Sequence, residues 1–456
     1  MTAAVPGAFI NCSLKGPGFS RAVLSRINTG LQPLREVEME YNRPHTRAAW
    51  GTMGTDWETN VDFVRLRRER FEKAQAAVKA RGLGAVLAFE IDNVRYITGT
   101  HIGEWCRDKM NRYAICPRES KPFLFDPAPP AKRISSPWIE DRMEAPISNM
   151  LGAIPPELNV QKSFARQIKR ILTGYGVEKE PLGVDHMEIT MLRALEKEGL
   201  EVVDGQQSML DAREIKTGDE IELLKKAAGM VDATYVDLAK AIRPGVRENE
   251  LVAIANYHLY KFGSERVQCV NSVSGARGKP HCHTFSDRII QPGDIVYLDL
   301  MHAYMGYQTC YYRTFVCGKP NRCQIEAYET ASKWLSDAID MIRPGVTTAD
   351  VCKVWPTAEE FGYRNEDEAY LLQYGHGLGL GQWERPIFSR RFSLDHPAEI
   401  KENMVFALET WCGAADGSGA ARIEEQVVVT KGGCEIMTNF PSDHLISCGL
   451  PGCEVF

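Results

Sequence analysis

Residues 293–315, GDIVYLDLMHAYMGYQTCYYRTF, place one carboxylate, Asp299, inside an apolar and β-branched run. Ile295, Val296, Leu298 and Leu300 surround it, and a short run of this kind predicts a buried strand. An ionised carboxylate is costly to bury there unless a cation or a strong hydrogen-bond donor meets it. The stretch therefore predicts a functional site as well as a strand.

Two acids further along the chain have similar surroundings. Glu409 lies in NMVFALETW (403–411) and Glu424 lies in AARIEEQVVVT (420–430), and apolar residues typical of buried strands flank both. Three carboxylates that meet in one place repel one another unless positive charge lies between them. We therefore expect a metal ion or a cationic group of a substrate at their centre.

Composition excludes several classes of protein. The 456 residues are 44% hydrophobic, which is enough for two ordinary domains, and the net charge of -6 gives no basic surface for nucleic acid. No run of about 18 apolar residues predicts a membrane span, and the first residues lack the apolar core of a signal peptide. The 13 cysteines are scattered and odd in number, which favours reduced thiols and a cytoplasmic protein.

The order of apolar patterns predicts an α/β (α+β) protein with three parts. Residues 1–60 are interpreted as an N-terminal arm, residues 61–212 as an α/β domain, and residues 213–456 as a second domain that carries the three acids. In the second part we expect a helix over 62–81, strands at 84–90 and 93–99, and βα alternation to residue 212. Thr217 and Glu220 are spaced as a capping box that starts a long helix of the third part.

The third part contains an internal repeat. The sequence IRPGV occurs at 242–246 and again at 342–346, each time after a segment with helical spacing of apolar residues. A further helix and a strand with a central acid follow each copy, Asp299 in one case and Glu409 in the other. Duplication therefore predicts two related halves about a pseudo-twofold axis, with their acids brought together.

Three histidines add candidate site residues. His376 lies among glycines in YGHGLGLGQWERP (374–386), where backbone can approach a ligand closely, although a lone histidine is more often structural. His281 and His283 alternate in an extended segment, so their rings point the same way, and either one can transfer a proton. A solvated loop is the alternative for this pair. His302 is interpreted as a surface residue or as a neighbour of the site residues.

Aromatic and basic residues give a possible substrate pocket. Trp383, Trp411, Tyr307 and Tyr311 can contact a cation through their ring faces, although each also suits a core. Arg422 lies two residues before Glu424, which puts both on one face of a strand, and a bidentate ion pair between them is expected.

The order of these motifs resembles one known family. Asp299, GYQTCYYRTF (306–315), GHGLGLG (375–381), ETW (409–411) and RIEE (422–425) follow one another as in the pita-bread family of methionine aminopeptidases, aminopeptidase P, prolidase, creatinase and the related dimethylsulfoniopropionate (DMSP) lyases. The similarity covers roughly residues 65–440. It implies a creatinase-like N-terminal domain followed by a pita-bread catalytic domain with an internal duplication.

The resemblance also implies a ligand set and marks where this chain departs from it. Family peptidases hold two metal ions with two Asp, one His and two Glu, which match Asp299, His376, Glu409 and Glu424, but the second Asp falls on Cys310. A thiolate can bind zinc or another borderline-soft metal, but it removes the hard bridging oxygen that a dinuclear hydrolase uses. A divalent ion such as Fe, Zn or Mn is therefore expected as one ion or none rather than two.

Two more departures concern the reaction. Peptidases that cut before proline usually have a second histidine seven residues after the first, and Trp383 stands there. The lyases use an Asp six residues after the metal-binding histidine, and Gln382 stands there, so that Glu384 is the remaining acid of this loop. Creatinase keeps the fold without several metal ligands and uses a histidine near the position of His281 or His283 for proton transfer.

The leading hypothesis is a metal-assisted or creatinase-like hydrolase or lyase that cleaves a C–N bond, or an adjacent C–S bond, in a small polar or cationic substrate. The alternatives are an Xaa-Pro metallopeptidase, a DMSP lyase and a non-catalytic protein that binds a partner in the cleft. We expect a homodimer without nucleic acid or membrane partners. The proposed roles divide into catalytic residues His281, His283, His376, Glu409 and Glu424; substrate-binding residues Tyr307, Trp383 and Arg422; and metal ligands Asp299, Cys310, His376, Glu409 and Glu424.

Overall fold

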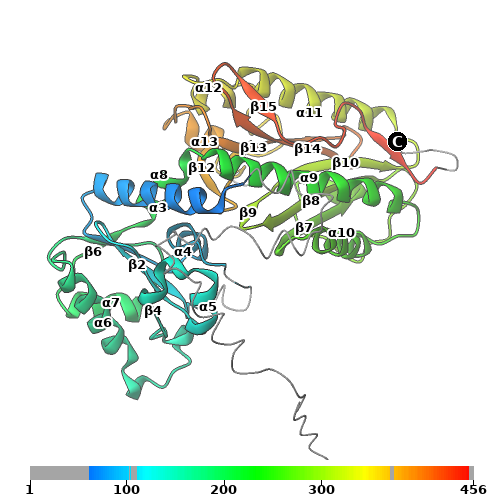
Figure 1. Cartoon of the computed structure of the whole chain (residues 1–456). Coiled ribbons are helices and arrows are strands. Elements are labelled where there is room, and N and C mark those ends of the chain that lie inside the picture. Colours follow the sequence, from blue (N-terminus) through cyan, green and yellow to red (C-terminus); the bar gives the residue numbers. More distant parts are fainter. Residues whose placement is uncertain (1–60, 102, 104–109, 370–373, 451–456) are drawn as a thin grey trace, which may run out of the picture. The chain divides into compact units, whose positions relative to one another are not determined.

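The computed structural model describes residues 61–450 apart from 102, 104–109 and 370–373 (Figure 1). The described residues all lie in one compact unit, residues 56–456. The expected arm at 1–60 lies outside the described residues.

Helices and strands alternate through the first part of the described chain. Its elements are α3 (Phe63–Ala80), β1 (Ala85–Ala88), α4 (Ile91–Thr98), β2 (Tyr113–Pro117), β3 (Phe123–Phe125), α5 (Pro129–Ser135), β4 (Met143–Glu144), α6 (Val160–Gly174), β5 (Leu182–Val184), α7 (Ile189–Lys197), β6 (Val202–Asp204) and α8 (Gln206–Glu214).

The later elements begin with the long helix that the capping box predicted. They are α9 (Gly218–Ala241), α10 (Glu248–Phe262), β7 (Arg266–Ser274), β8 (Ile295–Tyr304), β9 (Tyr307–Gln308), β10 (Tyr312–Cys317), α11 (Arg322–Met341), α12 (Thr348–Cys352), β11 (Gly375–Gly377), β12 (Glu384–Phe388), α13 (Arg390–Ser393), β13 (Val405–Gly413), β14 (Ala420–Val429), β15 (Cys434–Ile436) and β16 (Ile446–Cys448).

A six-stranded sheet in the order β4-β3-β2-β1-β5-β6 forms the first part. Strand β1 pairs antiparallel with β2 and parallel with β5, and all four of its residues are buried because helices cover both faces. Val86 and Ala88 pack in one apolar cluster with residues of α3 and α4, whereas Ala85 and Leu87 pack in another with residues of α6 and α7. Alternating side chains of one strand thus build two cores.

The strand predicted at 93–99 is wrong, because these residues form most of α4. The side chain of Glu90 accepts a hydrogen bond from Asp92 N at the start of the helix, and Gly99 ends it with a φ of 71°. All residues of α4 except Arg95 are buried. This eight-residue helix buries its polar Asp92 and Asn93 along with its apolar residues, so no solvent-facing stripe reveals its period in the sequence.

The capping box is confirmed, and it fixes the start of α9. Glu220 N donates to Thr217 Oγ1 over 3.4 Å, and Thr217 N donates to Glu220 Oε2 over 2.8 Å. The domain boundary between residues 212 and 213 falls inside α8 and stays a prediction.

Two five-stranded sheets form the remainder of the fold. One has the order β16-β10-β8-β7, with β9 paired to β8, and the other has the order β12-β11-β13-β14-β15. Residues of α9 and α10 pack with the first sheet, and residues of α11 pack with β13 and β14 of the second. The sheets meet between β10 and β14, where Thr314 Oγ1 donates to Arg422 O over 2.6 Å and accepts from Arg422 N over 2.8 Å.

The predicted duplication is present in the backbone. Gly245 N donates to Ile290 O, and Gly345 N donates to Ile400 O, each over 3.0 Å. The two glycines have φ values of 92° and 88°, which lie in the left-handed region that favours glycine. A helix precedes each IRPGV copy and a helix follows it, so the repeated sequence encodes the same turn twice.

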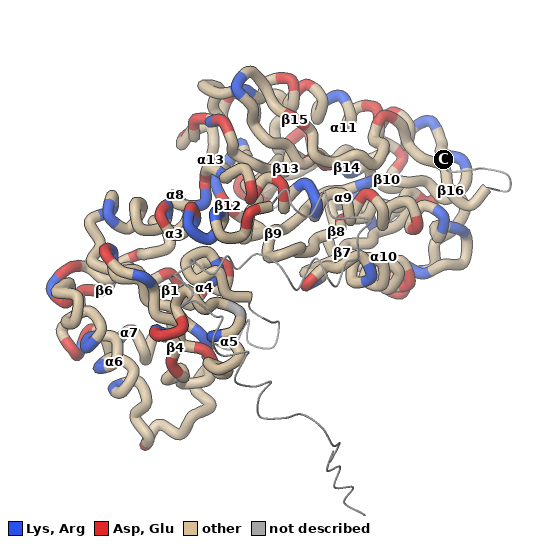
Figure 2. The backbone as a smooth tube through the Cα atoms, viewed as in Figure 1, with Lys and Arg blue, Asp and Glu red and all other residues tan. Residues whose placement is uncertain are grey.

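Charge and hydropathy of the described residues agree with the limits set by composition. Lys and Arg are interspersed with Asp and Glu over the described part of the chain (Figure 2). Within the part of the chain that the structure describes, no helix combines the length and the apolar character needed to cross a bilayer. The cytoplasmic location and the homodimer stay predictions.

Candidate functional site

The three predicted acids lie on strands of the two sheets that meet at β10 and β14. Asp299 lies in β8, Glu409 in β13 and Glu424 in β14, and all three are buried. Glu409 and Glu424 are directly opposite in the antiparallel register. Like charges in such a pair destabilise a sheet unless something compensates them.

Cys310 connects the acids of the two sheets. Its Sγ atom lies 3.7 Å from Asp299 Oδ1 and 3.9 Å from Oδ2. The potential ligand atoms of Cys310, His376 and Glu424 all lie within 4.8 Å of one another, and the three residues are buried. The position at which the family pattern has its second Asp therefore does face the cluster.

His376 and Glu424 have atoms that are available to a ligand. His376 Nδ1 lies 3.1 Å from Gly377 O, and a proton placed on Nδ1 leaves the Nε2 lone pair free. Neither carboxylate oxygen of Glu424 accepts a hydrogen bond from an N–H or O–H group of the described residues. Buried polar atoms normally have partners, so these oxygens point to an additional group at the site.

Arg422 pairs with Glu409 and not with Glu424, which corrects the sequence prediction. Arg422 Nη2 donates to Glu409 Oε2, and the guanidinium lies 4.0 Å from the ring centroid of Tyr312. Arg422 is opposite Trp411 in the register, which makes Glu409 its diagonal neighbour on β13. A long side chain reaches such a diagonal neighbour as easily as one on its own strand.

Burial and mutual repulsion favour the protonated forms of the acids. Burial, together with Glu409, raises the pKa of Asp299 to about 7, although Arg422 opposes the shift. Burial and the charges of Glu409 and Asp299 raise the pKa of Glu424 well above its ordinary value, and burial does the same to the Cys310 thiol. If all three carboxylates are ionised, one guanidinium leaves two negative charges, and a Cys310 thiolate would add a third, so a divalent ion would offset most of the charge.

The donor set fits a divalent metal. A thiolate, an imidazole and carboxylate oxygens are ligands that suit zinc or iron. The Glu424 oxygens, which no N–H or O–H group of the described residues meets, supply the independent structural observation for that fit. Cys310 must lose its proton for its sulfur to ligate.

His281 and His283 lie next to Arg422. Their ring centroids are 4.2 Å apart, and His283 Nε2 is 3.1 Å from Arg422 Nη1. Burial and the Arg422 charge lower the pKa of His283 to about 4 and lower that of His281 as well. Nε2 of His281 is buried without a partner among the described residues, so a neutral His281 can accept a proton there.

The glycines after His376 pack around Glu384. A Cβ atom at Gly379 would lie 2.5 Å from the Glu384 carboxylate. Glu384 is buried, and it pairs with Lys216 over 2.9 Å and with Arg213 over 3.3 Å. Burial opposes its ionised form, but these two cations lower its pKa, so Glu384 anchors the loop and does not supply a base.

The predicted aromatic residues divide into two groups. Trp383 is 54% exposed, and its ring stacks on that of His376 with the centroids 5.3 Å apart and an interplanar angle of 8°, so the other face of the indole is open. Trp411 is buried beside His281, with ring centroids 6.0 Å apart. Tyr307 and Tyr311 are buried, and their hydroxyl groups donate hydrogen bonds to Glu220 and to Asp232, respectively.

His302 is not at the surface, so that part of its interpretation is wrong. It is buried, with Nε2 2.9 Å from Ala227 O and Nδ1 3.1 Å from Ser264 Oγ. Burial lowers its pKa to about 4. It therefore connects β8 to α9.

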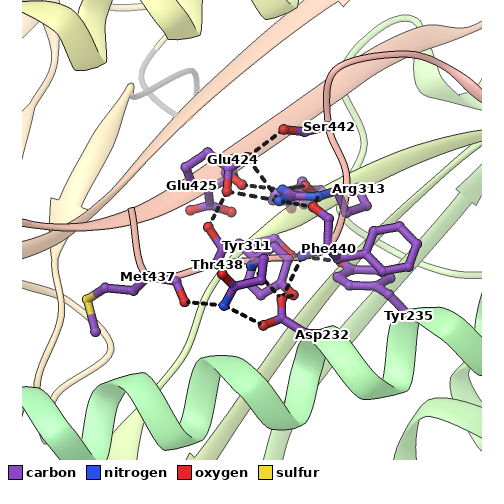
Figure 3. Close-up of polar contacts among 12 residues, drawn as sticks. Asp232, Tyr235, Tyr311, Arg313, Glu424, Glu425, Met437, Thr438, Phe440 and Ser442 are labelled. Carbon is purple, nitrogen blue, oxygen red and sulfur yellow. Dashed lines mark hydrogen bonds and ion pairs between the residues drawn. The ribbon is translucent and has the colours of Figure 1, made fainter. Parts of the chain in front are cut away.

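Sequence reasoning missed a second buried charge cluster on the opposite face of β14 (Figure 3). Arg313 Nη2 lies 2.9 Å from both carboxylate oxygens of Glu425. Thr438 Oγ1 and Ser442 Oγ also donate to Glu425, the latter over 2.7 Å. The two adjacent glutamates in RIEE were a signal for it, because successive strand residues face opposite ways.

Comparisons with known proteins agree with this arrangement. The family described as metallopeptidase family M24 matches residues 222–431. The chain is 26% identical to the dimethylsulfoniopropionate lyase DddP of Roseovarius nubinhibens over 417 residues, covering 87% of this chain and 91% of the lyase. It is 31% identical to the Xaa-Pro dipeptidase of Pyrococcus furiosus over 230 residues, covering 50% of this chain and 64% of the dipeptidase.

Solved structures of peptidases share the fold. The prolidase from Thermococcus sibiricus aligns with a TM-score of 0.68 and 24% identity over 84% of this chain and 99% of its own. The Xaa-Pro dipeptidase from Bacillus anthracis aligns with a TM-score of 0.66 and 22% identity over 83% of this chain and 99% of its own. These likenesses show the predicted architecture.

Proposed function

Because this chain belongs to the creatinase, aminopeptidase P and prolidase family of pita-bread enzymes, we propose that it is a one-metal lyase or hydrolase for a small cationic substrate. It is an enzyme of this family, a hydrolase or a lyase. The bond that we propose it breaks is a C–S or C–N bond beside the cationic group of the substrate. A zwitterion with a sulfonium or quaternary ammonium group and a carboxylate is the substrate class.

The single observation on which this proposal depends is the ion pair between Arg422 and Glu409. A dinuclear site needs carboxylates on both ions, but Glu409 already neutralises a guanidinium inside the protein. Asp299, Cys310, His376 and Glu424 then remain as ligands of one divalent ion. With a thiol at the position of the second Asp, the donor set supports one ion and disfavours a bridged pair.

The remaining residues suit an elimination or a related cleavage. A bound divalent ion would act as a Lewis acid and neutralise a substrate carboxylate. The open face of Trp383 would receive the cationic group by cation–π contact, beside His376. His281 would take a proton at Nε2 from the carbon next to the substrate carboxylate. The electrons of that C–H bond form a double bond to the neighbouring carbon. The electrons of the C–S bond leave with the sulfur, which departs as a neutral sulfide.

The length of the similarity favours the lyase branch within this proposal. The similarity to the dimethylsulfoniopropionate lyase extends through both the sheet of the first part and the catalytic region, whereas that to the Pyrococcus furiosus dipeptidase covers half of this chain. An Xaa-Pro dipeptidase is the second candidate, because the identity is higher over that shorter region. The two candidates differ in the expected metal content.

Metal analysis combined with activity assays tests the proposal. Protein purified without chelators should contain about one divalent ion per chain and should release dimethyl sulfide from DMSP, or an amine from a betaine-like or creatine-like compound. Cys310→Asp should raise the metal content toward two ions, and Cys317→Asp, outside the proposed ligand set, should not raise it. Two ions in the wild-type protein, with chelator-sensitive cleavage of Xaa-Pro dipeptides, would favour the dipeptidase instead.

A further inference from the structure

Glu248, the first residue of α10, is a fully buried carboxylate outside the ligand set described above. Its Oε1 atom accepts hydrogen bonds from Ser274 N over 2.8 Å and from Ser274 Oγ over 2.7 Å. Ser274 is the last residue of β7, immediately before the segment that carries the two site histidines. One oxygen of Glu248 therefore holds the beginning of that segment.

The other oxygen of Glu248 holds the end of the same segment. Oε2 accepts from Ser286 N and from Ser286 Oγ, each over 2.8 Å, and also from Arg277 Nη1. Arg277 Nη2 in turn donates to Thr284 O over 2.8 Å, which closes the segment on itself. Such charge-assisted bonds are stronger than neutral ones, so one carboxylate fixes both ends.

We propose that Glu248 is a positioning residue that holds His281 and His283 in place beside Arg422. The middle of the segment has a further attachment, where Tyr297 OH donates to Cys282 O over 2.7 Å. With both ends fixed by Glu248, the imidazoles keep their place in the buried site. The inference rests on the proposed function in one respect, which is the role of His281 in proton transfer.

The second repeat shows that the turn itself does not need a carboxylate. Thr348 follows the second IRPGV copy at the position that Glu248 has after the first. Its Oγ1 atom accepts one hydrogen bond, from Ala398 N over 3.0 Å, and its N donates to Ala398 O over 2.9 Å. A small hydroxyl residue is therefore sufficient to join this helix start to its neighbouring chain. The carboxylate is specific to the half that carries His281 and His283.

Glu248→Gln tests the proposal with almost no change in side-chain shape. An amide keeps one acceptor oxygen but turns the other into a donor, so it releases one end of the segment. Glu250→Gln is the matched control, because Glu250 lies in the same helix turn and accepts from Arg247 N without contacting the segment. We expect hydrogen exchange over residues 275–288 to rise at least about tenfold in Glu248→Gln and to stay unchanged in the control.

Histidine NMR gives a readout that a loss of global stability would not move. The His281 and His283 signals, assigned through His281→Asn and His283→Asn, should stay those of neutral imidazole at pH 6 in the wild type. In Glu248→Gln they should begin to titrate toward the ordinary histidine value of about 6.5, because the rings leave the buried site beside Arg422. With DMSP as the probe, kcat should fall about 100-fold while metal content and KM hold.

Unchanged exchange and unchanged histidine signals in a folded Glu248→Gln protein would overturn the proposal. If that variant does not fold, Ser274→Ala and Ser286→Ala remove one bond at each end and should each raise exchange of the segment. No rise in either of them would also overturn it. Altered exchange and histidine signals, in a wild type that cleaves neither DMSP nor a betaine-like or creatine-like compound, would support Glu248 while rejecting the proposed function.

Discussion

Glu424 and Glu425 are neighbours in β14 and both are buried, yet their surroundings are opposite. Glu425 accepts hydrogen bonds from Arg313, Thr438 and Ser442, so the protein itself balances its charge (Figure 3). Glu424 accepts none from N–H or O–H groups of the described residues, and burial together with its acidic neighbours raises its pKa. Burial alone therefore does not distinguish a structural acid from a functional one, whereas the partners do.

The largest loss of stability is expected for a change on the face of β14 where Glu425 pairs with Arg313. Glu425→Ala leaves the buried Arg313 without its carboxylate, and breaking a buried ion pair in this way costs about 3–5 kcal/mol of unfolding free energy. Urea denaturation of the metal-free protein measures the loss. A variant within about 1 kcal/mol of the wild type would show that Glu425 is not the structural partner that the contacts indicate.

A pair of arginine variants compares how much zinc stabilises the protein when the cation on either face of β14 is removed, and the expected effect is smaller. Arg422→Met removes the internal cation of the site, and Arg313→Met removes that of the opposite face. Zinc should stabilise Arg422→Met more than the wild type by about 0.5–3 kcal/mol, because the ion then compensates a further negative charge. Its effect on Arg313→Met should equal that on the wild type. Denaturation with and without zinc gives both numbers, and equal gains in all three proteins would contradict the assignment.

The smallest effect is expected for Glu424→Gln in the metal-free protein. The folded state raises the pKa of Glu424, so it retains a proton that the unfolded chain releases above its ordinary value. The contribution of Glu424 to stability is therefore present at low pH and is lost as pH rises through the folded-state pKa. Glutamine does not titrate, so the unfolding free energy of the variant should rise relative to that of the wild type as pH rises, by on the order of 1 kcal/mol at pH 8.

Denaturation at pH 4, 6 and 8 follows this trend directly. Glu402→Gln is a suitable control, because it makes the same change at an exposed residue. A pH-independent difference between Glu424→Gln and the wild type would show that Glu424 is ionised equally in both states. With bound metal the wild type should become the more stable of the two proteins, since Glu424 then ligates the ion and the glutamine of the variant does not.

The sequence was informative where one residue contradicted its neighbours. Asp299 and Glu424 stood out because a carboxylate in an apolar strand carries a visible cost, and the identical IRPGV copies indicated the duplication directly. Element boundaries with side-chain signals, such as Thr217 with Glu220, were also predictable. In each case the information lies within a few residues of the chain.

Pairings that depend on strand register could not be predicted in the same way. Arg422 was expected to bind Glu424 on its own strand, but the register of β13 places Glu409 within its reach. Arg313 and Glu425 are 112 residues apart, and nothing local connects them. Tyr307 was assigned to the substrate although it donates to Glu220 across the core, because a buried hydroxyl and a substrate-binding one look alike in sequence.

The placement of β16 has a consequence for biosynthesis. This strand follows the entire second repeat in sequence, but it pairs in parallel with β10 and completes the sheet of the first repeat. On the ribosome, the first repeat therefore emerges with the β10 edge open and stays so while more than a hundred residues are added. An unpaired strand edge can pair with other nascent chains. Chaperone protection during that interval should therefore raise the yield of folded protein.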